Sequence, residues 1–132
     1  MRLVKNRRWY WNFIRQLRNL SKEGFVEQER ITRKQQREYM RYHNDDYYVC
    51  VTWDGRPVGY IGSVAGDIRL AVVPWRRNSG IGKFMLKKFM ALRPWAFAKV
   101  LIDNQASHRL FKSCGFEITH INDKFIYYKK KK

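Results

Sequence analysis

The residues of this sequence that are best placed to do chemistry form a basic turn with two glycines, from Arg76 to Gly82. An apolar run ending at Pro74 precedes the turn, and a segment with apolar residues at helical spacing follows it. A turn between a strand and a helix directs several backbone N–H groups to one point, where the helix N-terminus adds partial positive charge. Gly80 and Gly82 would let the backbone approach a ligand where a Cβ would collide. The pattern therefore predicts a phosphate-binding turn.

Two common phosphate-binding motifs are absent from this turn. It contains no G-x-x-x-x-G-K-[ST], and it contains no G-x-G-x-x-G followed by an acidic residue. The pattern that fits is Arg77-x-x-Gly80-x-Gly82 after an apolar strand. Short patterns of this kind also occur by chance, in an ordinary strand–turn–helix with a solvated basic loop. The turn alone therefore leaves the ligand-binding and the purely structural interpretation equally open.

A second motif lies further along the chain and combines a polar strand end with a short helix. Residues 104–107 read N-Q-A-S, and residues 114–117 read C-G-F-E. The amide of Asn104 offers both a donor and an acceptor. Gly115 in the left-handed conformation would end the helix, and Phe116 would then pack into the core. Taken alone, this motif is also compatible with a structural cap at each end of a helix.

In this order and at this spacing, the two motifs together resemble those of the GNAT superfamily, the GCN5-related N-acetyltransferases. The resemblance covers residues 47–121 well and the preceding helices only by pattern. It implies direct transfer of an acetyl group from acetyl-CoA to an amine. It also implies the set of residues that bind acetyl-CoA: Val72, Val73, Arg77, Asn78, Ser79, Gly80, Ile81, Gly82, Lys83, Asn104 and Ser107.

The transfer requires a base, because the attacking amine must lose a proton. Asp67 is the first candidate, since it opens the central strand where many members of the family carry an acidic residue. Glu27 and Glu29 come next, in the connector that usually lines the acceptor site of the family. The backbone N–H of Val73 occupies the position from which the family stabilises the developing oxyanion.

The acid that would protonate the leaving thiolate stays unassigned. Many members of the family use a Tyr in the last helix, and the matching residue here is Phe111, which has no proton to donate. Cys114 and Ser113 are nearby alternatives, and Tyr60 and Tyr48 are weaker ones. A thiolate has a relatively low pKa and can leave without an acid, so activity does not require one.

Composition and size indicate a globular protein. The 132 residues are 45% hydrophobic and 16% aromatic, and they predict a single domain over residues 1–132. No apolar run approaches the length of a membrane span, and no secretory signal is visible. Cys50 and Cys114 are expected to be buried thiols in a reducing cytoplasm. Two cysteines are too few for a structural zinc site, and the three histidines show no ligand spacing, so we expect no metal.

The net charge of +17 is extreme for a small enzyme and indicates either a polyanionic partner or a basic surface without a specific partner. Coenzyme A is itself an anion, but it needs only a few of the 28 basic residues. Trp9, Tyr10 and Trp11 lie among arginines and would be able to stack on bases. The basic tail at residues 129–132 is expected to be solvated and frayed.

The element pattern predicts a mixed α/β fold with a mainly antiparallel start and a central parallel pair. The resemblance implies a GNAT fold, with a mostly antiparallel central sheet, two splayed parallel strands and flanking helices. Asp54-Gly55 marks a hairpin turn, and Thr32 is a plausible N-cap. We expect strands at 2–5, 47–53, 57–62, 68–73 and 95–102, helices at 8–20, 33–42, 83–92 and 108–114, and a C-terminal hairpin over 116–130.

Three functions remain open at this point. The first is an N-acetyltransferase acting on a small amine; residues 13–19 loosely resemble the first helix of GNAT proteins that act on nucleotide-linked amino sugars or protein N-termini. The second is an acetyltransferase acting on a nucleic acid or on a nucleic-acid-bound protein, which the charge favours. The third is a non-catalytic module that binds coenzyme A, which Phe111 favours. The sequence leaves open whether the protein is a monomer or a homodimer.

Overall fold

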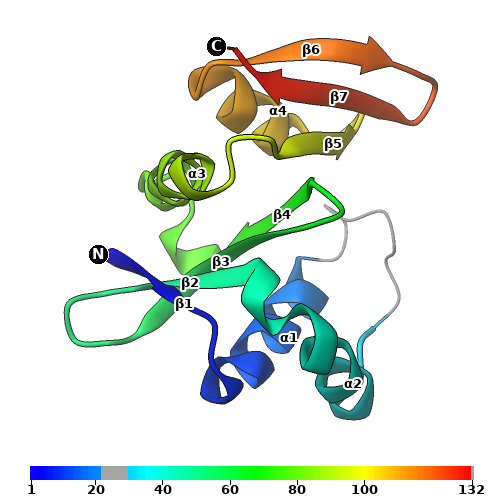
Figure 1. Ribbon diagram of the computed structural model, residues 1–132. Helices are drawn as coiled ribbons and strands as arrows, with labels where there is room; N and C mark the ends of the chain where they lie inside the picture. Colours follow the sequence, from blue (N-terminus) through cyan, green and yellow to red (C-terminus); the bar gives the residue numbers. More distant parts are fainter. Residues whose placement is uncertain (22–29, 132) are drawn as a thin grey trace.

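The computed structural model describes residues 1–21 and 30–131 of the chain. Their strands form one seven-stranded sheet in the order β1-β2-β3-β4-β5-β7-β6, flanked by helices (Figure 1). All neighbouring strands are antiparallel except β4 and β5. The strands are β1 (Arg2–Lys5), β2 (Tyr47–Val51), β3 (Pro57–Val64), β4 (Asp67–Val72), β5 (Phe97–Leu101), β6 (Phe116–Ile121) and β7 (Phe125–Lys130). The predicted fold class is confirmed.

The β2–β3 hairpin forms where the sequence predicts it. The β-branched and aromatic residues of β2 suit a buried strand, and the turn at Asp54-Gly55 uses a left-handed glycine with φ of 83°. The return strand is longer than expected, because it pairs with β4 as far as Val64. The segment between the strands expected at 57–62 and 68–73 therefore shrinks to Ala65 and Gly66, both with positive φ.

The parallel strands β4 and β5 touch at one end only. The backbone N–H of Phe97 donates to the carbonyl of Gly66 at 2.8 Å, and Asp67 opposite Phe97 is the single pair in their register. Figure 1 shows the two ribbons diverging beyond this point. The splayed parallel pair that the sequence predicted is confirmed, and the divergence leaves backbone groups of both strands without a strand partner.

Helices α1 (Trp11–Leu20) and α2 (Arg33–His43) cover one face of the sheet (Figure 1). A short 3-10 helix, Arg8–Tyr10, precedes α1, so the helix expected from residue 8 begins in this tighter form. Thr32 caps α2 with its hydroxyl, and the Gln35 side chain bonds back to the Thr32 N–H, which completes a capping box. The predicted N-cap is confirmed.

Helix α3 (Ile81–Leu92) packs on the opposite face of the sheet. Two neighbouring tyrosines of β2 lie on opposite faces of the sheet. Tyr47 packs toward Tyr39 of α2, whereas Tyr48 packs on Phe89 of α3. Met85, Leu86 and Phe89 of α3 are fully buried, and they fill the core on this face together with Ile61.

Helix α4 (Gln105–Ser113) begins three residues earlier than expected, because Asn104 caps it. The prediction of a frayed tail at residues 129–132 is wrong for Lys129 and Lys130. Lys129 pairs with Phe97 and Lys130 pairs with Phe116, so both belong to β7. The N–H of Lys131 then donates to the carbonyl of Gly115 at 3.0 Å. Pairing on both sides of β7 holds the basic end of the chain in the sheet.

Candidate active site

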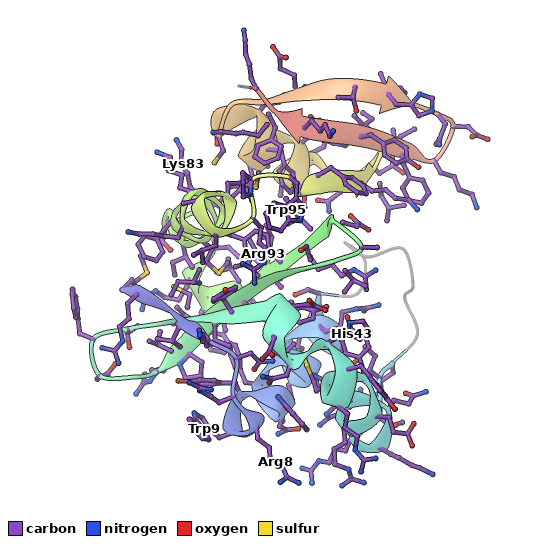
Figure 2. All side chains as sticks on the ribbon, in the orientation of Figure 1. Arg8, Trp9, His43, Lys83, Arg93 and Trp95 are labelled. Carbon is purple, nitrogen blue, oxygen red and sulfur yellow. The ribbon has the colours of Figure 1, made fainter. Side chains whose placement is uncertain are left out.

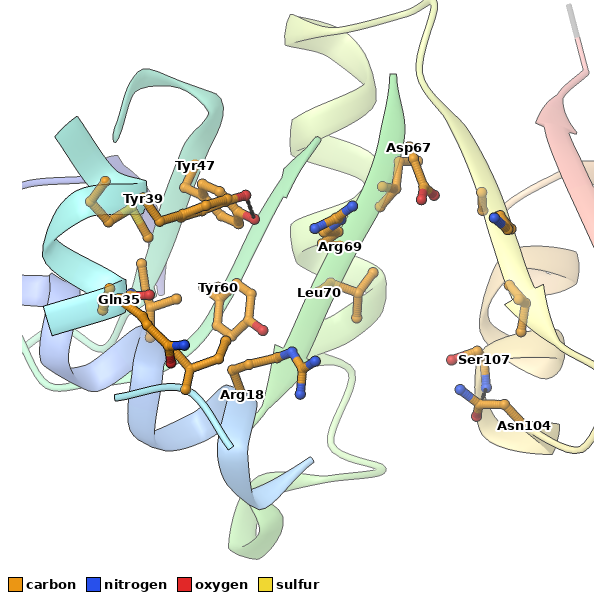
Figure 3. Close-up of a pocket in the computed structure, with 18 of the residues that line it drawn as sticks. Arg18, Gln35, Tyr39, Tyr47, Tyr60, Asp67, Arg69, Leu70, Asn104 and Ser107 are labelled. Carbon is orange, nitrogen blue, oxygen red and sulfur yellow. Dashed lines mark hydrogen bonds between the residues drawn. The ribbon is translucent and has the colours of Figure 1, made fainter. Parts of the chain in front are cut away.

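A cavity of about 540 Å³ lies between the α1–α2 face and the opening between β4 and β5 (Figure 3). Residues from both helices, from three central strands, from β5 and from α4 line it. The described lining residues are Ile14, Arg18, Arg30, Ile31, Gln35, Gln36, Tyr39, Met40, Tyr47, Tyr60, Asp67, Ile68, Arg69, Leu70, Ala98, Lys99, Val100, Asn104, Ser107 and Phe111. The cavity therefore joins segments that are distant in the sequence.

The backbone of β4 presents alternate N–H groups to this opening. The N–H of Val73 donates to the carbonyl of Val58 at 2.9 Å, and the carbonyl of Val73 accepts from the N–H of Arg76 at 3.0 Å. Because N–H groups alternate in direction along an antiparallel strand, those of Leu70 and Val72 are directed away from β3, toward the splay. The N–H of Val73, which was expected to stabilise the oxyanion, is therefore bonded to β3, and the N–H groups that face the opening are those of Leu70 and Val72.

The basic turn ends at a helix N-terminus with free donors. Gly80 is the N-cap of α3 in the left-handed conformation, with φ of 86°, and its carbonyl accepts from the N–H of Phe84 at 2.9 Å. The backbone N–H groups of Ile81, Gly82 and Lys83 precede this first helical bond, so they have no backbone acceptor within the described turn and helix. A Cβ built on Gly80 would meet open space. These features fit a bound phosphate group.

Side chains of the turn stabilise its conformation. The guanidinium of Arg77 donates to the hydroxyl of Ser21 at 3.0 Å and to the carbonyl of Val72 at 3.4 Å, which ties the turn to the end of α1. Asn78 adopts the left-handed conformation, with φ of 61°, and the hydroxyl of Ser79 donates to the carbonyl of Arg76. The expected ligand-binding turn therefore lies directly before α3, and Lys83 is in the first turn of that helix (Figure 2).

Gly82 lies where α3 approaches α4 and β4. A Cβ at this position would lie 3.4 Å from the Leu110 side chain and 3.9 Å from Val72, which are ordinary van der Waals distances. Packing within the protein therefore does not require a glycine here, and the expected approach to a ligand stays a prediction.

Asn104 and Ser107 line the cavity from the start of α4. The Asn104 side-chain oxygen accepts from the N–H of Ser107 at 3.2 Å, so it caps the helix. The sequence predicted that this amide would offer both a donor and an acceptor to a ligand. Its oxygen is already used, which leaves its NH₂ group as the available donor.

Asp67 lies at the edge of β4 with its side chain in the cavity (Figure 3). Its Oδ1 atom is buried and has no hydrogen-bond partner among the described residues. Burial raises the pKa of the carboxyl above its ordinary value of 3.8, while the positive charges of Arg69 and Lys99 act against that rise. An unsatisfied carboxylate oxygen of this kind is suited to accept a proton from a bound group.

A tyrosine pair that sequence reasoning missed faces Asp67 across the cavity. The hydroxyls of Tyr39 and Tyr47 are 2.7 Å apart. Burial raises the pKa of both phenols, so both stay neutral at physiological pH. Tyr60 also lines the cavity, and burial raises its pKa too. Tyr48, the other tyrosine considered as an acid, lies on the α3 face and does not line the cavity.

The structure does not bring Cys114 to the cavity. Cys114 lines a second, smaller hollow of about 350 Å³ between α3 and the end of β7. Phe111 does line the main cavity, where its ring stacks on Tyr128 with centroids 5.8 Å apart. The residue that the resemblance matches to the family's acid therefore lies in the cavity but has no proton to donate. Glu27 and Glu29 lie outside the described residues.

The remaining expectations concern metals, membranes and thiols. Cys50 and Cys114 are both free and buried, as predicted. Within residues 1–21 and 30–131, no cluster of three or more His, Cys, Asp or Glu residues is arranged to hold a metal ion. In the same part of the chain, none of the helices has the length and apolar character needed to cross a membrane.

A comparison of the sequence with models of protein families identifies the family of this chain. Residues 11–116 match the model of the acetyltransferase (GNAT) family. The chain belongs to this family. The GNAT acetyltransferase assignment agrees with the turn before α3 and with the splayed β4–β5 pair described above. No curated protein matches the sequence.

Solved structures of GNAT proteins share the fold at low sequence identity. A ribosomal-protein-alanine N-acetyltransferase from Brucella melitensis superposes with a TM-score of 0.80 at 16% identity, over 97% of this chain and 98% of the other. For yncA from Salmonella typhimurium, solved with its cofactor acetyl-CoA, the TM-score is 0.78 at 16% identity, over 96% of this chain and 91% of the other. For spermidine N-acetyltransferase from Vibrio cholerae, solved with CoA and spermine, the TM-score is 0.73 at 16% identity, over 96% of this chain and 91% of the other.

Proposed function

We propose that this protein is an acetyl-CoA-dependent N-acetyltransferase that moves an acetyl group directly to a primary amine of a small molecule. The observation that carries the proposal is the opening between β4 and β5, which pair only at Asp67 and Phe97. The cavity beside this opening holds the half-buried carboxylate of Asp67, and the free N–H groups at the start of α3 follow the other end of β4. Membership of the GNAT family supports the reaction class. Helices α1 and α2 wall the cavity, which supports a small acceptor (Figure 3).

The residues present suit acetyl-CoA. The N–H groups of Ile81, Gly82 and Lys83 would hold the pyrophosphate at the start of α3. The C=O groups of Leu70 and Val72, which face the splay, would accept from the amides of the pantetheine arm in place of the missing strand partner, and their N–H groups stay available as donors. The NH₂ group of Asn104 and the hydroxyl of Ser107 would bind further along that arm, at the edge of the cavity; both residues line it.

The chemistry follows from the groups that meet at the cavity. When bound, acetyl-CoA supplies a thioester whose carbonyl carbon takes the amine nitrogen and whose sulfur leaves as a thiolate. Asp67 accepts the proton that the amine loses, directly or through a water molecule. The N–H groups of Leu70 and Val72 are the donors directed toward the developing oxyanion. Phe111 cannot supply a proton, so the thiolate leaves unprotonated and takes its proton from solvent.

Release of free CoA tests this proposal. The purified protein is incubated with acetyl-CoA and a panel of amines, amino-sugar nucleotides, peptides and nucleic acids, and the free thiol is followed with a thiol-reactive dye. Stabilisation by acetyl-CoA in a thermal-shift assay, together with CoA release that depends on a small amine, is the expected result. Stabilisation without release in the presence of any acceptor would instead support a non-catalytic module.

A nucleic-acid acceptor is the second candidate, and the net charge of +17 is the observation that favours it. The expected aromatic trio supports it less than the sequence suggested. Trp9 is 75% exposed, but the indole of Trp11 donates to the side chain of Asn44 at 2.8 Å, and Tyr10 packs against the core. Radiolabelled acetyl-CoA distinguishes the candidates: label found in tRNA or DNA at physiological salt supports this one, and label found only in small amines excludes it.

A further inference from the structure

The walls of the cavity carry more positive than negative charge. Arg18, Arg30, Arg69 and Lys99 line it, whereas Asp67 is the one carboxylate among its described lining residues. The four basic residues come from α1, from the segment before α2, from β4 and from β5, so they surround the cavity instead of forming one exposed stripe. Positive charge that converges on an enclosed space indicates a bound anionic group.

Arg69 is the central member of this set. Asp67 and Arg69 are two residues apart on β4, so their side chains lie on the same face of the strand, about 7 Å apart along it. Figure 3 shows the Arg69 side chain between Asp67 and the Tyr39–Tyr47 hydroxyl pair. The two phenols are neutral because burial raises the pKa of each, so they do not compensate the guanidinium.

The charge around Asp67 is unevenly balanced. Arg69 and Lys99 both act electrostatically on this carboxyl. The Lys99 ammonium lies over the Phe125 ring, 4.4 Å from its centroid, so Arg69 is the cation of this pair that faces the cavity. The coenzyme does not supply the missing negative charge here, because the phosphate-binding turn at residues 77–83 contributes no residue to the cavity lining. Among the described lining residues no second carboxylate completes the balance, so an anionic group on the acceptor would do so.

We infer that the acceptor is a small amine that carries an anionic group, with its nitrogen at Asp67 and its carboxylate or phosphate at Arg69. The inference rests on the proposed N-acetyltransferase function and narrows its substrate class. A guanidinium binds either anion with two parallel hydrogen bonds, so it fixes the orientation of the acceptor as well as its charge. Polyamines, such as the spermine in the Vibrio cholerae structure, are excluded by the same charges.

Matched pairs of acceptors test the inference in the wild-type protein. Glycine is compared with glycinamide, O-phosphoethanolamine with ethanolamine, and spermidine is included as a polycation. We expect the anionic member of at least one pair to have a kcat/KM about tenfold or more above its neutral partner, and spermidine to be inactive. A preference within the glycine pair would identify the anionic group of the acceptor as a carboxylate, and a preference within the ethanolamine pair would identify it as a phosphate. Neutral amines or spermidine acetylated as well as the anionic members would overturn the inference.

An Arg69→Gln variant locates the effect, with Arg56→Gln in the exposed β2–β3 turn as the matched control. We expect Arg69→Gln to reduce kcat/KM for the anionic acceptor about tenfold and to leave the neutral acceptor within about twofold. Arg56→Gln should change neither. An equal loss for both acceptors in Arg69→Gln would assign Arg69 a structural role and contradict the inference.

Binding separates failure of the inference from failure of the proposed function. Calorimetry with CoA-saturated protein measures the affinity for glycine, glycinamide and the two ethanolamine compounds without any transfer. Absence of acetylation, together with tighter binding of the anionic members, would contradict the enzyme assignment and retain the anion site. Acetylation of amines without any preference for an anionic group would contradict the anion site alone.

Discussion

The Nδ1 atom of His108 lies 2.7 Å from the hydroxyl of Tyr128, in the core between α4 and β7. The Nε2 atom of the same ring lies 3.0 Å from the carbonyl of Leu101 and 2.9 Å from that of Ile102. Carbonyls only accept, so Nε2 carries the proton and the Tyr128 hydroxyl donates to Nδ1. This buried pair fixes the beginning of α4, and with it Asn104, against β5 and β7.

Loss of this hydrogen bond should destabilise the fold. Tyr128→Phe leaves the buried Nδ1 of His108 without a donor, and we expect the free energy of unfolding to fall by about 1–3 kcal/mol. Urea denaturation followed by circular dichroism measures the change. Tyr127→Phe in the same strand is the control, because the hydroxyl of Tyr127 makes no hydrogen bond to the described residues. Equal effects of the two substitutions would show that the pair is not a stabilising contact.

Acetyl-CoA binding should depend on the left-handed glycine before α3. Gly80→Asp places a carboxylate beside the donors that would hold the pyrophosphate, and we expect calorimetry to show no binding while circular dichroism shows a folded protein. Gly55→Asp is a close control, since Gly55 also has a positive φ of 83° and open space where a Cβ would lie. Both variants incur a similar backbone strain of about 1–2 kcal/mol. Wild-type affinity in Gly80→Asp would remove the turn from the coenzyme site.

Asp67 should affect turnover more than coenzyme affinity. Asp67→Asn keeps the size of the side chain and removes the base, so we expect kcat to fall about 100-fold or more with the acetyl-CoA affinity unchanged. In the wild-type protein, the rate should rise with pH through the raised pKa of Asp67, because only the ionised carboxylate accepts a proton. Unchanged turnover in the variant would move the role of the base to Glu27 or Glu29.

The same carboxyl predicts a pH effect on stability. Because its pKa is higher in the folded than in the unfolded protein, the folded state binds more protons between the ordinary value of 3.8 and the raised value. The contribution of Asp67 to stability therefore falls as pH rises through this window. Asp67→Asn should lack this fall, so its melting temperature relative to wild type should increase from about pH 3.5 to about pH 7, as differential scanning calorimetry would measure. A constant or decreasing difference would contradict the raised pKa.

The missing acid provides a gain-of-function prediction. Phe111→Tyr adds a hydroxyl to a ring that lines the cavity, and we expect kcat to rise with little change in the KM for acetyl-CoA. Phe116→Tyr is the matched control, because Phe116 is equally buried, packs edge-on against Phe111 and lies outside the main cavity. A kcat that stays the same or falls in Phe111→Tyr, relative to Phe116→Tyr, would show that the thiolate needs no acid here.

Local sequence determined the features that depend on a few neighbouring residues. The Asp54-Gly55 turn, the Thr32 cap and the glycine turn before α3 form where they were predicted, since each satisfies backbone groups within one short segment. The GNAT resemblance followed from two such local motifs, and the family match confirms it. The start of α4 was missed by three residues, because its cap at Asn104 was interpreted as a ligand-binding amide.

Only the tertiary structure decided which side chains meet. The direction of each N–H in β4 depends on its register with β3, which turns the N–H of Val73 to β3 and those of Leu70 and Val72 to the opening. The separation of β4 from β5 and the packing of α2 brought Arg69 and Tyr39 to one cavity with Asp67 and left Cys114 outside it. Contacts between residues far apart in the chain depend on strand order and helix packing, and no spacing within a single segment encodes them.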